Sequence, residues 1–265
     1  MALVPLSPSQ HGDLRLAPGP LRHLEERPLV ELGVAEAARA ALDLPLVFIA
    51  REEGLHLCAL LSPTATDNAQ LGPRGRWMGG YMPALIRAHP LVLGPAREGA
   101  TAPVLIDPDS DWFSRDQGEP LFDAQGQPSA VVTQRMERLR TLAPNPARDA
   151  PVLAAVAASG VLAPWEGAPK ALPGPLLSAS PARLAALEAE VLLQLHAAGA
   201  LGLLYLQEAS RARLVRLEGL AKRKAQGRKQ AAQRGVSETT DFVLRPDEAQ
   251  LQFDDPDSDD AEVNP

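Results

Sequence analysis

The hydrophobic pattern of this chain changes from strand-like to helical about halfway along, and this change constrains the fold more than any single motif. The first half contains apolar runs of strand length, whereas apolar positions from about residue 129 onward recur at spacings of three and four. Strands and helices that are segregated along a chain are typical of an α+β fold rather than of alternating α/β units. We therefore expect an α+β protein with antiparallel strands mainly in the N-terminal half and helices mainly in the C-terminal half.

Two neighbouring apolar runs are the clearest strand pair. Residues 44–50 and 55–61 are separated by the charged link Arg51–Glu52–Glu53–Gly54, which predicts a β-hairpin. Residues 90–94 and 102–106 are further strand candidates, and residues 14–17 and 174–177 carry weaker strand signals. Because aromatic residues make up only 4% of the chain, the core must be largely aliphatic.

Helical signals occur at residues 34–42, 129–142, 149–159, 180–198 and 201–220. In the second of these segments, Val132, Met136 and Leu139 lie on one helical face. Ser180 and Pro181 are a typical N-cap and first helical residue, so we expect one helix from there to about residue 198. The last segment is expected to reach about residue 220, and a break near Ser210 is left open.

Charge divides the chain into a body and a polar C-terminal region. Residues 235–265 carry ten acidic side chains and one basic side chain, Arg245, whereas residues 222–234 carry six basic side chains and no acidic one. The acidic segment has few apolar side chains to bury and its like charges repel, which favours disorder. We expect a globular domain at residues 1–221, with a Pro/Gly-rich candidate subdomain boundary at 163–174. A basic helix end and a disordered acidic tail are expected at 222–265.

Composition and targeting signals exclude several classes of protein. A single cysteine, Cys58, excludes a disulfide framework and a thiolate zinc cluster, and its apolar neighbours predict a buried, unreactive thiol. The first residues lack the charged and apolar regions of a secretory signal, and no apolar run is long enough to span a bilayer. We therefore expect a cytoplasmic protein without a transmembrane segment. The basic run lacks interleaved aromatic residues for base stacking, so nucleic acid is not the expected partner.

The sequence carries no recognisable catalytic motif. It contains no Gly-x-Ser-x-Gly elbow, no Walker-type phosphate loop and no His-Glu-x-x-His. The stretch from Asp107 to Trp112 begins like a calcium loop, but Trp112 stands where the turn needs glycine and Gly118 where the bidentate glutamate belongs. We therefore predict no catalytic residue, no metal and no cofactor, and an enzymatic activity is the less favoured alternative.

Aromatic residues cluster in one segment of the chain. Five of the ten fall between Trp77 and Phe122. Tryptophan and tyrosine combine a large apolar face with a polar group, which suits a binding surface, and an arginine among them suits a carboxylate. The candidate binding residues are Trp77, Tyr81, Arg87, His89, Trp112 and Phe122. The alternative is that they anchor the aliphatic core, with Arg87 in a structural salt bridge.

The same segment resembles the central block of the SapC family, which is named for surface-layer-associated bacterial proteins. The residues that carry the resemblance are Gly75–Arg76–Trp77, Tyr81–Met82–Pro83–Ala84, Ile86–Arg87 and Pro90. Further blocks agree in order between residues 3 and 220, at Leu3–Leu6, Pro45–Phe48, Asp67–Asn68, Glu119–Asp123, Pro128–Ser129 and Leu195–Gly199. The aromatic pair that follows the arginine in the family is replaced here by His89 and Leu91.

The resemblance implies a bacterial protein that is tied by name to the surface layer and has no established catalytic residues. Family members often lie near genes for flavin-dependent tryptophan halogenases, cupin-type hydroxylases and outer-membrane receptors. Our first hypothesis is therefore a non-catalytic intracellular accessory protein that binds a protein or peptide partner in a surface-layer or cell-surface modification pathway. The alternative is an enzyme, or the partner of an oxygenase or halogenase, with a pocket between Trp77 and Arg87. The sequence leaves the oligomeric state open.

Overall fold

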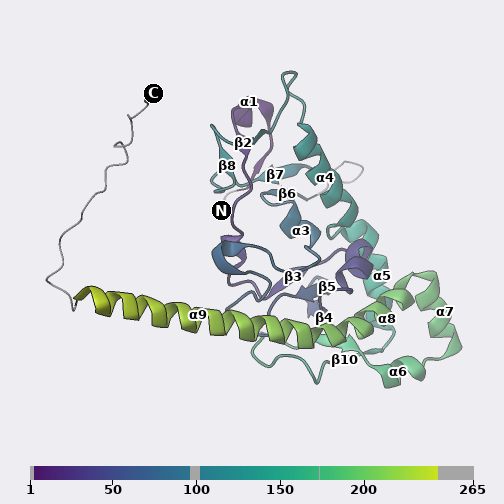
Figure 1. Ribbon diagram of the computed structural model, residues 1–265. Coiled ribbons are helices and arrows are strands. Elements are labelled where there is room, and N and C mark those ends of the chain that lie inside the picture. The colour runs from purple at the N-terminus through teal and green to yellow at the C-terminus, as the bar shows by residue number, and fades with distance from the viewer. Residues whose placement is uncertain (1–2, 96–101, 173, 244–265) are drawn as a thin grey trace, which may run out of the picture. The chain divides into compact units, whose positions relative to one another are not determined.

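The computed structural model describes residues 3–95, 102–172 and 174–243, with the backbone alone at 232 and 234–243 (Figure 1). Strands lie mostly in the N-terminal half and helices in the C-terminal half, which confirms the α+β fold expected from the sequence. By residue contacts the chain divides into two units, Met1–Lys224 and Ala225–Pro265. The stretch 163–174 lies within the first unit, and the acidic residues 244–265 lie outside the described part of the chain.

The largest sheet has five strands in the order β10–β11–β4–β5–β3, and every pairing in it is antiparallel. Its centre is the hairpin of β4 (Leu46–Arg51) and β5 (Gly54–Leu60), which confirms the hairpin predicted from the apolar runs. Gly54 has a φ of 137°, a conformation that the tight turn uses and that other residues rarely adopt. Strand β3 (Leu29–Glu31) forms one edge beside β5. On the other side, β11 (Leu177–Ala179) pairs with β4, and β10 (Leu162–Pro164) forms the second edge.

Side chains from α8 (Ala200–Ser210) complete the junction between β11 and β4. The buried Gln207 side chain accepts a hydrogen bond from the Ala179 amide at 2.8 Å and donates one to the Leu46 carbonyl at 2.9 Å. Ser210 Oγ accepts a hydrogen bond from the Leu46 amide at 2.9 Å. Buried backbone groups need such partners, so these contacts hold α8 across the sheet.

Two smaller antiparallel sheets bring the N-terminal residues beside the segment 91–120. The strand candidates at 90–94 and 102–106 are confirmed as β6 and β7, and the structure pairs them with each other. The first sheet has the order β1 (Val4–Pro5), β7 (Val104–Ile106), β6 (Leu91–Leu93). The second has the order β8 (Phe113–Ser114), β2 (Arg15–Leu16), β9 (Glu119–Pro120).

The remaining helices follow the predicted order but differ at several ends. They are α1 (Pro8–His11), α2 (Ala37–Ala40), α3 (Ala84–Arg87), α4 (Ala130–Leu142), α5 (Pro146–Ala158), α6 (Pro181–Ala185), α7 (Ala189–Ala197) and α9 (Leu214–Val243). Short 3-10 turns lie at Arg22–Leu24, Val34–Glu36, Pro73–Gly75 and Arg211–Arg213. The last of these separates α8 from α9, so the break considered near Ser210 is present.

Three helix boundaries differ from the prediction. The single helix predicted for 180–198 is wrong, because Glu188 has an extended backbone and separates α6 from α7. Arg183 of α6 donates to the Leu162 carbonyl of β10, whereas α7 packs on α5 and α8. Helix α5 starts before residue 149, because Asn145 caps it by accepting a hydrogen bond from the Arg148 amide. Helix α9 continues through the basic run to Val243, beyond the predicted end at about residue 220.

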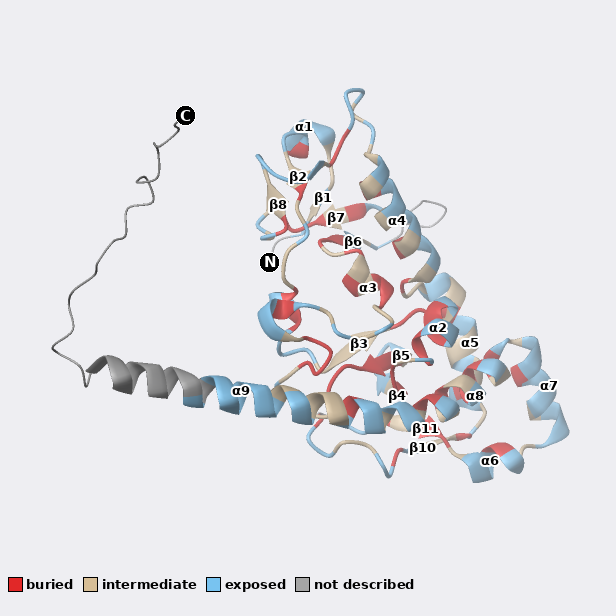
Figure 2. Ribbon diagram, in the orientation of Figure 1, coloured by how far each residue is buried: buried red, intermediate tan, exposed pale blue. Residues whose placement is uncertain are grey.

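Both faces of the β4–β5 hairpin are buried, which explains its continuous apolar runs (Figure 2). Because side chains alternate along a strand, Leu46 and Phe48 enter the main core, while Val47 enters a second cluster with Trp165 and Leu217. Aliphatic side chains dominate both clusters, as the composition predicted.

Cys58 lies in the second cluster and is buried and unpaired. Burial, and then the charge of Glu31, raise the pKa of its thiol to about 12, which agrees with the unreactive thiol predicted from its neighbours. Across the described ranges, no single helix has the length and apolar character needed to cross a membrane, although α7 and Ala200–Ala231 pass that test together as a pair bent by 94°.

Candidate functional site

The candidate residues begin in a tight loop that ends at Trp77. Leu71 and Trp77 form an isolated antiparallel bridge, and the Gly72 amide donates to the Arg76 carbonyl at 2.8 Å. The turn needs positive φ angles at Arg74 and Gly75, 59° and 68°. The loop leaves Trp77 half-buried.

A buried glutamate organises the chain that follows this loop. Glu36 is completely buried at the end of the Val34–Glu36 turn. Its Oε2 accepts hydrogen bonds from the Tyr81 hydroxyl at 2.7 Å and from the Ala84 amide at 2.9 Å, whereas Oε1 has no partner among the described residues. Burial raises the pKa of Glu36, and the bonds from Ala84 and Tyr81 oppose that rise. Glu36 therefore fixes both Tyr81 and the start of α3.

Tyr81 and Arg87 form one half of the candidate site. Burial and the hydrogen bond to Glu36 raise the pKa of Tyr81 well above its usual value, so the phenol stays protonated and donates. The Arg87 guanidinium lies 5.4 Å from the centre of the Tyr81 ring and donates to the Met82 carbonyl at 2.7 Å. Within the described ranges Arg87 forms no ion pair with a carboxylate at 4 Å or less, so the structural salt bridge considered above is not observed there.

Asp43 ties this half of the site to α9. One carboxylate oxygen accepts a hydrogen bond from the Tyr81 amide, and the other pairs with the Arg216 guanidinium. A Cβ at Gly80 would lie 2.9 Å from the Asp43 carboxyl carbon, so a larger residue at this position would displace the carboxylate. Three segments that are distant in sequence therefore meet at Asp43.

His89 and Trp112 form the other half of the candidate site. The His89 ring stacks on His23 with centroids 3.8 Å apart and meets the edge of Trp112 at 4.8 Å. Burial, and then the charges of His23 and Arg135, lower the pKa of His89 to about 3. Its imidazole is therefore neutral at physiological pH, and Ser110 Oγ lies 3.3 Å from its Nε2.

Arg135 joins the two halves from α4. Its Nη1 donates to the carbonyls of Arg87 and His89, at 2.6 and 2.9 Å, and its guanidinium lies 5.8 Å from the centre of the Trp112 ring. The structure thus places Tyr81 and Arg87 in one cluster and His89 and Trp112 in the adjoining one. Trp77 lies at the end of the loop that leads to Tyr81. The sixth, Phe122, is buried in the main core.

Glu36, Arg135 and His23 were missing from the sequence prediction. Glu36 is the only charged residue between Val34 and Ala38, and an isolated acid in an apolar run is a signal of a buried polar anchor. Arg135 lies beside the predicted apolar stripe of its helix, three residues after Val132. No local signal points to His23.

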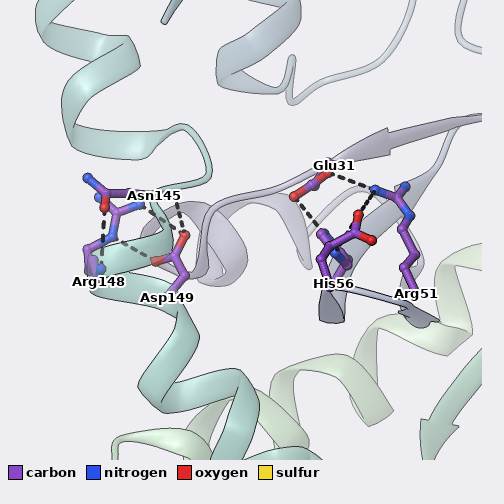
Figure 3. A network of polar contacts seen from close by, with 7 residues as sticks. Glu31, Arg51, His56, Asn145, Arg148 and Asp149 are labelled. Atoms are coloured by element: carbon purple, nitrogen blue, oxygen red, sulfur yellow. Dashed lines mark hydrogen bonds and ion pairs between the residues drawn. The ribbon is translucent and has the colours of Figure 1, made fainter. Parts of the chain in front are cut away.

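Other polar networks lie on the large sheet and at the α4–α5 corner (Figure 3). Glu31 pairs with Arg51 at 3.3 Å, and its other oxygen lies 2.9 Å from His56 Nδ1. At the corner, Asp149 accepts hydrogen bonds from the Asn145 amide and from Arg148 Nε. These contacts give the charged residues of both networks a structural role: the first links neighbouring strands of the large sheet, and the second caps the start of α5.

A small cavity of about 200 Å³ lies in the loop between β10 and β11. It is lined by residues between Pro164 and Leu176, none of which belongs to the candidate set. The described side chains contain no group of three or more His, Cys, Asp or Glu arranged to hold a metal ion. The calcium-like stretch instead forms a turn in which Asp107 accepts a hydrogen bond from the Asp109 amide.

Comparison with known proteins places the candidate residues inside a family match. The family model described as SapC matches residues 6–217, which is more than half of the chain and includes every candidate residue. No curated protein and no solved structure matches the chain.

Proposed function

Because the chain belongs to the SapC family, we propose that it is a non-catalytic accessory protein that binds a protein or peptide partner. The proposal places it in the cytoplasm, in a pathway that builds or modifies the surface layer or another part of the cell surface. The partner contacts the segment from Trp77 to Arg87, which we name the docking segment. The family match assigns the chain to the SapC family, and the residues of the docking segment support a binding role.

One observation carries the proposal. The docking segment presents Trp77, Met78, Tyr81 and Arg87 at least partly to solvent, and Met78 is 52% exposed. Aromatic residues, methionine and arginine are the types enriched at protein interfaces, and tyrosine, tryptophan and arginine dominate binding hot spots. The chain has only three tryptophans and two tyrosines, so this concentration favours an interface.

The titrating groups at the site also favour binding over acid–base chemistry. General acid–base catalysis near neutrality is most effective with a pKa close to 7. The pKa of His89 is lowered to about 3 by burial, and the pKa of Tyr81 is raised by burial and by Glu36. Neither group suits proton transfer at neutral pH, so the enzymatic alternative has less support than the binding role.

Site-specific photocrosslinking tests the proposal. A benzoylphenylalanine residue replaces Met78 in one variant and Val92, an exposed residue of β6, in the control. After irradiation in native lysate, we expect the Met78 variant to form a discrete adduct with one polypeptide and the Val92 variant to form none. The proposal fails if the two variants give the same adducts, or if a variant with Tyr81→Ala and Arg87→Ala added still forms the adduct at full yield while remaining folded.

A further inference from the structure

Asp43 is the centre of a surface that extends beyond the docking segment. Its carboxylate contacts the Tyr81 amide and the Arg216 guanidinium, so the end of α2, the docking segment and the start of α9 meet there. We name this surface the Asp43 face. It comprises Asp43 and its contacts Tyr81 and Arg216, their sequence neighbours Leu42 and Val215, and Arg39 and Arg87, whose charges act on Tyr81. All belong to the first unit of the chain.

Two large aliphatic side chains on this face are open to solvent. Leu42, next to Asp43, is 69% exposed, and Val215, next to Arg216, is 76% exposed. They come from positions far apart in sequence, and the Asp43–Arg216 pair joins the two segments that carry them. Single exposed aliphatic residues are common. Two on segments that meet at Asp43, together with a half-buried tyrosine and an arginine that has no ion-pair partner among the described residues, form the mixed surface that binding hot spots use.

The charge of the face is positive. Arg39 is exposed, and both Arg87 and Arg39 lie close enough to Tyr81 for their charges to act on its hydroxyl. Within the described part of the chain neither guanidinium has a carboxylate within 4 Å, whereas Arg216 pairs with Asp43. Arg216 therefore offsets the charge of Asp43, and Glu36, which the Tyr81 hydroxyl contacts, is completely buried. The excess positive charge therefore faces outward.

We infer that the Asp43 face docks an acidic polypeptide segment that also carries apolar side chains. This inference rests on the proposed function and names the chemistry of its partner. Carboxylates of the partner pair with Arg39 and Arg87, where a bidentate fork is available, and its apolar side chains cover Leu42 and Val215. The complementary charges speed the encounter and exclude basic partners, and the apolar contacts supply desolvated area.

Fluorescence anisotropy with defined peptides tests the inference on the full chain. The acidic probe is a labelled peptide of aspartates alternating with leucine and phenylalanine. In the basic probe lysine replaces each aspartate, and in the polar probe serine replaces each apolar residue. We expect the acidic probe to bind, more weakly at high ionic strength, and the other two to bind at least tenfold more weakly.

Matched variants locate the site on the Asp43 face. Arg39→Glu should weaken the acidic probe about tenfold, because it replaces an attraction with a repulsion, whereas Arg27→Glu at another exposed arginine should not. Leu42→Ser should weaken binding severalfold, whereas Leu193→Ser should not, although Leu193 is exposed to the same extent at 67%. All four side chains are exposed, so folding is preserved and circular dichroism verifies it.

The outcomes separate this inference from the proposed function. Equal binding of acidic and basic probes, or equal loss in Arg39→Glu and Arg27→Glu, overturns the acidic partner. Capture of a partner at Met78 without binding of the acidic probe overturns it as well, and leaves the proposed function intact. Loss of the Met78 adduct in Arg39→Glu, with retention in Arg27→Glu, supports it for the natural partner.

Discussion

Replacing Tyr81 with phenylalanine removes the hydroxyl that donates to Glu36 at 2.7 Å and keeps the ring in place beneath Arg87. A hydrogen bond to a charged group contributes about 1.5–3 kcal/mol and one to a neutral group about 0.5–1.5 kcal/mol. Tyr81 is only half-buried, so the low end of each range applies. We expect Tyr81→Phe to lower the free energy of unfolding by about 1.5 kcal/mol at neutral pH, which corresponds to roughly 3–6 °C in Tm.

The effect should depend on pH in a defined direction. Burial raises the pKa of Glu36, so its contribution to stability is fully present below the unfolded value near 4.5 and decreases as pH rises through the folded value. The bond from Tyr81 opposes that rise by stabilising the carboxylate. Without it the folded pKa rises further, and the variant loses more stability than the wild type as pH increases. Below pH 4.5 the deficit should shrink to about 0.5 kcal/mol.

Urea unfolding followed by circular dichroism across this pH range measures both quantities. The matched control is Tyr205→Phe at the other tyrosine, which is 56% exposed and should change stability by less than about 0.5 kcal/mol. A deficit in Tyr81→Phe that is the same at every pH would refute the role assigned to the Glu36 carboxylate. A deficit no larger than that of Tyr205→Phe would refute the hydrogen bond itself.

Three further changes test the scaffold around the site. Gly33→Ala should lower the free energy of unfolding by more than about 2 kcal/mol, because its Cβ would meet backbone carbonyls of the α4–α5 corner. Gly202→Ala, on open helical surface, should raise the free energy of unfolding by about 0.5–1 kcal/mol, and thermal unfolding compares the two variants. Asn145→Ala should cost about 1 kcal/mol in chemical denaturation, and Ser129→Ala less, because only Asn145 makes a side-chain cap bond. Cys58 should resist a thiol reagent in the native protein and react quickly in urea, since burial raises its pKa to about 12; fast native labelling would contradict this.

The parts of the fold that the sequence predicted are those with local signals. The β4–β5 hairpin follows from two apolar runs and a short charged link, and α4 follows from its apolar stripe. The break between α6 and α7 has no such signal, since it depends on contacts of α7 with α5 and α8. The order β10–β11–β4 likewise depends on Gln207, which bonds to strands 28 and 161 residues away.

The sequence predicted the candidate site only in part, because its contacts also join residues that are distant in sequence. Aromatic clustering identified Tyr81 and Trp112, but not that Tyr81 bonds to a carboxylate 45 residues earlier, or that His89 stacks on His23. The residue types of the cluster are compatible with a binding surface and with a core position. Trp112 and Phe122 are buried, as the core alternative predicted, whereas Tyr81 and Arg87 are partly exposed. Residue type alone does not distinguish these positions, because burial depends on segments that meet only in the folded chain.

Helix α3 is held in place by contacts from elsewhere in the fold, and this bears on the proposed docking segment. It has four residues, too few to be stable alone, since isolated helices need roughly 12–15 residues. Glu36 holds its first amide at Ala84, and Arg135 holds the carbonyl of its last residue, Arg87. Each anchor comes from a different element, the Val34–Glu36 turn and α4. The position of Arg87 over the Tyr81 ring is therefore set before any partner arrives, and a surface that is ordered in advance loses less conformational entropy on binding.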